Sequence, residues 1–78
     1  MIENLVNYIK DDDYLIGIYT NMVHIFNYKK VINVLTSEII IEVKNIRVKI
    51  LGENLIIKKM DKFEMLINGK IKRVDFVE

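Results

Sequence analysis

Between Ile46 and Ile57 the chain reads IRVKILGENLII, and this stretch constrains the fold more than any other. From Ile46 to Ile50 apolar residues alternate with charged ones, the period of two that indicates a strand with one buried face and one solvated face. Gly52 interrupts the alternation, and the apolar pattern resumes at Leu55. We interpret the stretch as two strands joined by a tight turn or a bulge just after the glycine.

A related pattern returns between Met65 and Phe76, where apolar residues flank Asn68-Gly69. Asn-Gly is the dipeptide favoured in the primed turns of β-hairpins, so we expect a turn there. We expect Gly52 and Gly69 to need a positive φ or close backbone packing. The residues that carry the two patterns form a predicted structural motif: Ile50, Gly52, Leu55, Ile57, Ile67, Gly69, Ile71 and Val74.

Short apolar segments separated by polar breaks also lie at 14–21, 22–28, 31–35 and 38–44. Together they predict an all-β fold, a small antiparallel meander of about eight short strands closing into a sandwich or barrel. With 78 residues the chain holds one domain, which we place at 14–78. Residues 1–13 form an N-terminal amphipathic segment whose apolar spacing suits a short helix, with a stray strand as the alternative.

Catalytic and metal-binding patterns are sparse in this sequence. It has no cysteine and a single histidine, His24, between apolar neighbours, which favours a structural or partly exposed role. The sole serine, Ser37, lies in a turn signal, and neither patterned glycine belongs to a phosphate-binding motif. A Glu42–Glu64 acid–base pair is the remaining catalytic alternative, although carboxylates are common on exposed strands. We predict a non-enzymatic protein with no cofactor and no metal.

Two segments carry apolar side chains on both strand faces, Ile39–Ile41 and Leu55–Ile57. A chain this short has little material to cover a second apolar face, and 51% of its residues are hydrophobic. Ile40 and Ile56 are therefore candidate interface residues, for a protein partner or a homo-oligomer. No apolar run approaches the roughly 20 residues of a membrane span, and the first residues lack a secretory pattern, so we expect a cytoplasmic location.

Basic residues flank nearly every expected strand, which offers an alternative function in binding an anionic membrane or nucleic acid. The competing explanation is solubility and protection of sheet edges. Arginine is scarce and no aromatic residues interleave with the lysines, which disfavours nucleic acid. The residues concerned are Lys29, Lys30, Lys44, Arg47, Lys49, Lys58, Lys59, Lys62, Lys70, Lys72 and Arg73.

The order of these patterns resembles the YabP/YqfC family of sporulation proteins. The family pattern has four parts in order: a strand of the type E-x-I/V, then I-x-G-x-x-L-x-I, a short acidic connection, and I-x-G-x-I-x-x-V. The corresponding segments here start at Glu38, Ile50, Lys59 and Ile67. The resemblance covers roughly three quarters of the chain. It implies a structural or protein-interaction module in the mother-cell cytoplasm, at the forespore membrane beside a membrane partner.

Overall fold

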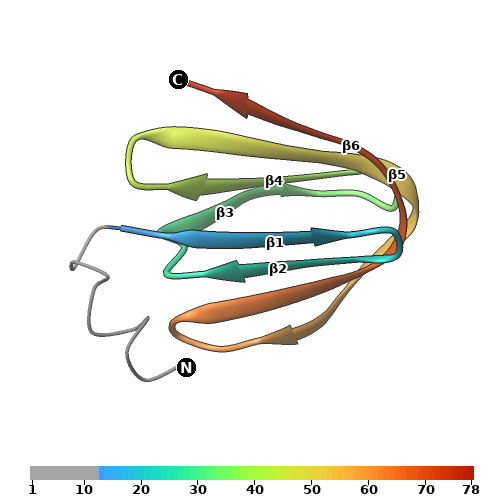
Figure 1. Ribbon diagram of the computed structural model, residues 1–78, viewed down its shortest axis with the longest axis horizontal. Helices are drawn as coiled ribbons and strands as arrows, with labels where there is room; N and C mark the ends of the chain where they lie inside the picture. Colours follow the sequence, from blue (N-terminus) through green and yellow to red (C-terminus); the bar gives the residue numbers. More distant parts are fainter. Residues whose placement is uncertain (1–12) are drawn as a thin grey trace.

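The computed structural model describes residues 13–78, which form an all-β fold with no helix. Six strands make one sheet in which every pairing is antiparallel, in the order β1-β2-β6-β5-β4-β3 (Figure 1). The all-β, antiparallel prediction is thereby confirmed. The strands are β1 (Leu15–Tyr19), β2 (Met22–Phe26), β3 (Lys30–Val34), β4 (Glu38–Val43), β5 (Ile46–Met60) and β6 (Glu64–Val77).

β5 and β6 are 15 and 14 residues long, and both bend sharply at the right of Figure 1. The bend divides the sheet into two halves. The β1–β2 half consists of β1, β2, the first part of β6 (64–68) and the last part of β5 (56–60). The β3–β4 half consists of β3, β4, the first part of β5 (46–51) and the last part of β6 (70–77). Each long strand therefore serves both halves.

Two glycines allow β5 and β6 to cross closely at the bend, where their register shifts. A Cβ atom on Gly52 would lie 2.1 Å from the carbonyl oxygen of Lys70. Gly69 has a φ of +142°, and a Cβ there would lie 2.9 Å from the carbonyl oxygen of Asn54. Asn54 itself adopts a positive φ of 53°, which asparagine tolerates better than most residues. The expected need for close packing or a positive φ is confirmed at both glycines.

The same geometry corrects two details of the sequence interpretation. Asn68-Gly69 is not a hairpin turn, because β6 continues through it to Val77. Gly52 likewise lies inside β5, so the eight expected strands are six, two of which are long and bent. A bulge and a turn use similar residues, and only long-range pairing decides between them. The helix expected within residues 1–13 lies almost entirely outside the described residues.

The two halves share one hydrophobic core. Its ten buried side chains come from β2, β4, β5 and β6. They alternate with outward-facing residues, most regularly on β4, where every second side chain is buried. Full burial of each such side chain contributes about 1.5–3 kcal/mol. The core residues are Val23, Ile25, Ile39, Ile41, Val43, Val48, Ile50, Leu55, Met65 and Ile67.

At the end of the molecule opposite the bend, the β2–β3 connection ties the halves together. The Asn27 N–H donates to the carbonyl of Phe63 in the β5–β6 turn, and the Tyr28 hydroxyl donates to the carbonyl of Asp61. The next residue, Lys29, donates its N–H to the carbonyl of Glu42 on β4 at 2.7 Å. The connection thus contacts both halves within three residues.

Candidate interaction surface

The outward-facing side of the β1–β2 half is largely apolar. Because Val23 and Ile25 point into the core, their neighbours on β2 point outward, and the register carries this orientation to the adjoining strands. Tyr19 is 55% exposed and Ile56 is 60% exposed. We call this surface the apolar face; its side chains are Leu15, Tyr19, Met22, His24, Phe26, Ile56, Lys59, Glu64, Leu66 and Asn68.

One polar cluster interrupts the apolar face. The Nε2 atom of His24 lies 2.9 Å from Oε2 of Glu64, and the ammonium of Lys59 lies 3.1 Å from the other carboxylate oxygen. An ionised carboxylate can only accept hydrogen bonds, so Nε2 carries the hydrogen in this contact. The bonds from His24 and Lys59 lower the pKa of Glu64 below its ordinary value, and Glu64 in turn raises the pKa of Lys59.

Beside this cluster is a shallow hollow of about 160 Å³, lined also by Tyr19, Met22 and Leu66. Both oxygens of Glu64 already have partners, so the cluster offers an oriented imidazole rather than a free carboxylate. Among residues 13–78 there is no group of three His, Cys, Asp or Glu side chains that could hold a metal ion. The arrangement suits recognition of a partner's polar group inside an apolar contact.

The structure separates the two carboxylates of the alternative catalytic pair. Glu42 lies on the outward-facing side of the β3–β4 half, opposite Lys30 and Arg47, whereas Glu64 lies on the apolar face. The partner of Glu42 is the ammonium of Lys30 at 3.9 Å. The two carboxylates therefore lie on different halves of the sheet, each with its own basic partner, and the structure does not bring them together.

Ile40 and Ile56, the two candidate interface residues, also lie on opposite sides. Ile40 is half-buried on β4, paired with Asn33 and Lys49. Ile56 stands at a corner where the apolar face meets a groove of about 570 Å³. The groove runs between the β3–β4 connection and β5, and its exposed rim includes Val34 and Leu35, which are 49% and 54% exposed. Only Ile56 therefore belongs to a continuous apolar surface.

The predicted structural motif lies in and around the core. Ile50, Leu55 and Ile67 are buried, and the remaining apolar members pack partly exposed against them. Gly52 and Gly69 are at the bend. The motif residues thus account for the shape of the sheet, and those that remain partly exposed are Ile57, Ile71 and Val74.

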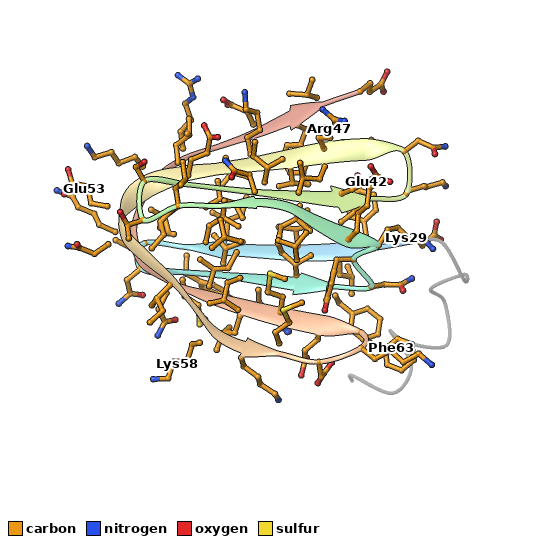
Figure 2. All side chains as sticks on the ribbon, turned by 180° about the vertical axis from the view of Figure 1, so that it is seen from behind. Lys29, Glu42, Arg47, Glu53, Lys58 and Phe63 are labelled. Carbon is orange, nitrogen blue, oxygen red and sulfur yellow. The ribbon has the colours of Figure 1, made fainter. Side chains whose placement is uncertain are left out.

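The β5–β6 turn projects a second, smaller surface. Asp61 accepts hydrogen bonds from the backbone N–H groups of Phe63 and Glu64, both at 2.9 Å, which lowers the pKa of its carboxyl. This local bonding holds a tight turn that presents Phe63, 54% exposed, with the Lys62 ammonium 5.5 Å from the ring centre. Figure 2 shows Phe63 at this end of the molecule and Lys58 projecting away from it.

The outward-facing side of the β3–β4 half is charged, and we call it the charged face. Its strands place acidic and basic side chains next to one another, including the Arg73–Asp75 pair at 2.9 Å. Ion pairs also neutralise basic residues elsewhere, such as Lys72 with Glu53 at 2.7 Å, which lowers the pKa of Glu53. The charged side chains of this face are Lys30, Glu38, Glu42, Arg47, Lys49, Arg73 and Asp75, and the uncharged ones among them are Asn33, Ile40, Leu51 and Val77.

The sequence analysis missed Tyr19, Met22 and the His24–Glu64–Lys59 cluster. A signal was present: β1 reads LIGIY and carries large apolar residues at both odd and even positions. The partly exposed histidine is confirmed, with 42% of its side chain accessible. Its partner Glu64 is 40 residues away in the chain, so no local pattern could have identified the pair.

Among residues 13–78 there is no helix with the length and hydropathy needed to cross a membrane. Comparison with protein-family models, with curated proteins and with solved structures finds no match to this chain.

Proposed function

We propose that this chain is a non-enzymatic module that binds another protein through its apolar face. The observation that carries the proposal is the exposure of Tyr19 and Ile56 on a sheet surface whose counterpart on the other half is charged. Contiguous exposed apolar patches with a polar rim commonly mark protein-binding sites. Tyrosine and methionine are also enriched where partners bury surface.

The exposed aromatic on the face and the adjoining groove give the partner two anchor points. Tyr19 borders the hollow beside His24, and Ile56 borders the groove lined by Val34 and Leu35. We expect truncation of either anchor to cost the most binding energy, because side chains that fill well-packed, desolvated pockets dominate interfaces, and tyrosine is enriched among them.

The biological setting follows from the resemblance to YabP/YqfC proteins and belongs to the same proposal. It is a sporulation role in the mother-cell cytoplasm, with a membrane protein at the forespore membrane as the partner. The spacing of Gly52 and Gly69 with their flanking apolar residues supports this assignment. We also propose that the two halves, which bury a common core, constitute a β-sandwich.

Co-purification from the host at low and high salt tests the binding proposal. The wild type should retain one protein partner at high salt, and a Tyr19→Glu/Ile56→Lys double variant should lose it. Ile40→Lys, on the charged face, is the matched control and should retain the partner. Recovery of lipid or nucleic acid that survives high salt, without a protein, would contradict the proposal.

A second candidate function rests on the β5–β6 turn, where Met60 and Phe63 are 53% and 54% exposed and the Lys62 ammonium lies 5.5 Å from the Phe63 ring centre. Exposed apolar residues flanked by lysines suit peripheral contact with an anionic bilayer, to which each lysine adds about 1 kcal/mol. Such binding should weaken with salt. Sedimentation with phosphatidylserine vesicles tests it: Phe63→Ser with Lys62→Glu should abolish co-sedimentation, whereas Tyr19→Glu should not.

A further inference from the structure

The last part of β6 is an edge strand. Beyond Ile71, whose N–H donates to the Thr20 carbonyl at 3.2 Å, no described residue pairs with β6 on the side away from β5. Figure 1 shows this part of β6 running along the upper margin of the molecule to the C-terminus. An unpaired row of N–H and C=O groups is a template for another strand.

The sequence of this edge is complementary to itself. Residues 72–76 read KRVDF, with Arg73 and Asp75 equally spaced on either side of Val74. In an antiparallel pair related by a two-fold axis, residues directly opposite each other share a sheet face. If the axis passes through Val74, the Arg73 of each copy stands opposite the Asp75 of the other. The contact then contains two pairs of opposite charge.

Neighbouring registers lack this match. Moving the axis by one residue, to Asp75, places the two Asp75 carboxylates directly opposite each other, which is destabilising. Moving it by one residue toward the bend, to Arg73, places the two Arg73 guanidinium groups directly opposite each other, which is also destabilising. This move also shifts the second copy further toward the β1–β2 turn, which already occupies the edge at Ile71. Arg73 and Asp75 already form an ion pair within each chain at 2.9 Å, and their side chains remain 69% and 34% exposed. The two copies can therefore join their pairs into one network of four alternating charges.

We propose that two copies of this chain associate edge to edge through residues Lys72–Phe76 of β6, antiparallel and centred on Val74. The β3–β4 halves then form one continuous sheet across the dimer, in the order β3-β4-β5-β6-β6-β5-β4-β3. Phe76, 51% exposed, gains the aliphatic stem of the second copy's Lys72 as a neighbour. The contact is independent of the partner proposed for the apolar face, because it uses neither Tyr19 nor Ile56.

The contact is small compared with the roughly 800 Å² per partner of a stable interface, so we expect a weak dimer with a dissociation constant of about 100 µM. Sedimentation velocity over a concentration series should show monomer converting to dimer. A wild type that stays monomeric at concentrations well above that value would overturn the proposal.

Charge exchange tests the register itself. In a dimer of Arg73→Asp two aspartate pairs stand opposite each other, and in a dimer of Asp75→Arg two arginine pairs do. Each variant alone should therefore lose at least ten-fold in its association constant, because both matched charge pairs of the contact are lost. Mixed in equal amounts, the two variants should form a heterodimer, because every opposed pair is then of opposite sign. The double variant Arg73→Asp/Asp75→Arg should self-associate as the wild type does.

Two controls separate this edge from other contacts. Lys58→Asp makes the same change in net charge as Arg73→Asp, but on β5 away from the edge, and should leave the dimer intact. Ile18→Lys alters β1, one of the two terminal strands of the six-stranded sheet, and should do the same. Loss of the dimer in Ile18→Lys with no effect of the charge exchange would assign the contact to β1 and overturn the proposal. Circular dichroism of each variant verifies folding.

Discussion

On the charged face, β4 and β5 alternate isoleucine or valine with glutamate, arginine or lysine, so that the inward residues are apolar and the outward ones are mostly charged. On the apolar face, β1 and β2 place large apolar residues on both sides, and Tyr19, Met22 and Phe26 face outward. Both faces belong to the same antiparallel sheet and cover the same core.

The difference indicates that the core does not require an apolar outer surface. The β3–β4 half folds with a charged outer side, which is the arrangement expected of a half-solvated antiparallel sheet. The apolar residues on the β1–β2 half therefore exceed what folding needs. The ion pairs of the two faces also differ. On the apolar face His24 and Lys59 both bind one carboxylate, Glu64, whereas the ion pairs of the charged face are distributed over several strands.

The largest expected effect compares the two sides of a single strand. Ile41 is fully buried and Ile40, its neighbour on β4, faces outward. Ile41→Ala should lower the free energy of unfolding by about 3–4 kcal/mol, through lost burial and a residual cavity. Ile40→Ala should cost less than about 1 kcal/mol. Urea denaturation measures both, and equal losses would show that Ile40 belongs to the core.

The next prediction concerns the bend that joins the two halves. Gly52→Ala should lower the free energy of unfolding by about 2–3 kcal/mol, because the new methyl group meets the backbone oxygen of Lys70, which cannot move aside. Gly17→Ala is the control, since its methyl group would contact only the side chain of Tyr19 at 3.2 Å. A thermal melt of Gly52→Ala superimposable on the wild type would contradict the close approach.

A third prediction distinguishes the two outer faces directly. Tyr19→Glu should shorten retention on a hydrophobic-interaction column substantially, because it removes a large exposed aromatic from the apolar face. Ile40→Glu should change retention less, since its surroundings are already polar. Tyr19→Glu should alter the free energy of unfolding by only about 0.5 kcal/mol, as is usual for exposed positions, and Ile40→Glu by about 1 kcal/mol because Ile40 is half-buried. Identical retention shifts would indicate that the two faces are equally apolar.

The smallest effect concerns the acid sensitivity of the apolar face. The pKa of Glu64 is lowered in the folded state, so its contribution to stability is present above its ordinary value of 4.5 and is lost as the pH falls through the folded value. Glu64→Gln should remove part of the decline in melting temperature below pH 4.5. Asp61 and Glu53, whose pKa values are also lowered, keep the remaining decline in both proteins. An unchanged pH profile would show that neither His24 nor Lys59 binds the Glu64 carboxylate in solution.

Local patterns were sufficient to predict an all-β fold and the buried side of β5 up to Ile50, because alternation of apolar and charged residues reports burial directly. They were insufficient at Gly52 and Gly69, where a bulge and a turn need the same residues. The choice was made by pairing between distant segments, such as Val23 with Ile67. Ile56 was identified as a candidate interface residue from its own segment, because Leu55–Ile57 has apolar residues on both strand faces. The exposure of Tyr19 depends on which strands the fold places around it, so no local pattern predicted it.

The pairing of β2 with β6 also has a consequence during protein synthesis. Val23 lies opposite Ile67, so the β1–β2 hairpin leaves the ribosome well before the strand that covers it. In that interval both its core-facing and its outward-facing apolar residues are exposed, the condition in which nascent β-hairpins aggregate or recruit chaperones. β3, β4 and β5 pair in chain order and have no such delay among themselves. The nascent chain is therefore most vulnerable through the segment that, once folded, carries the apolar face.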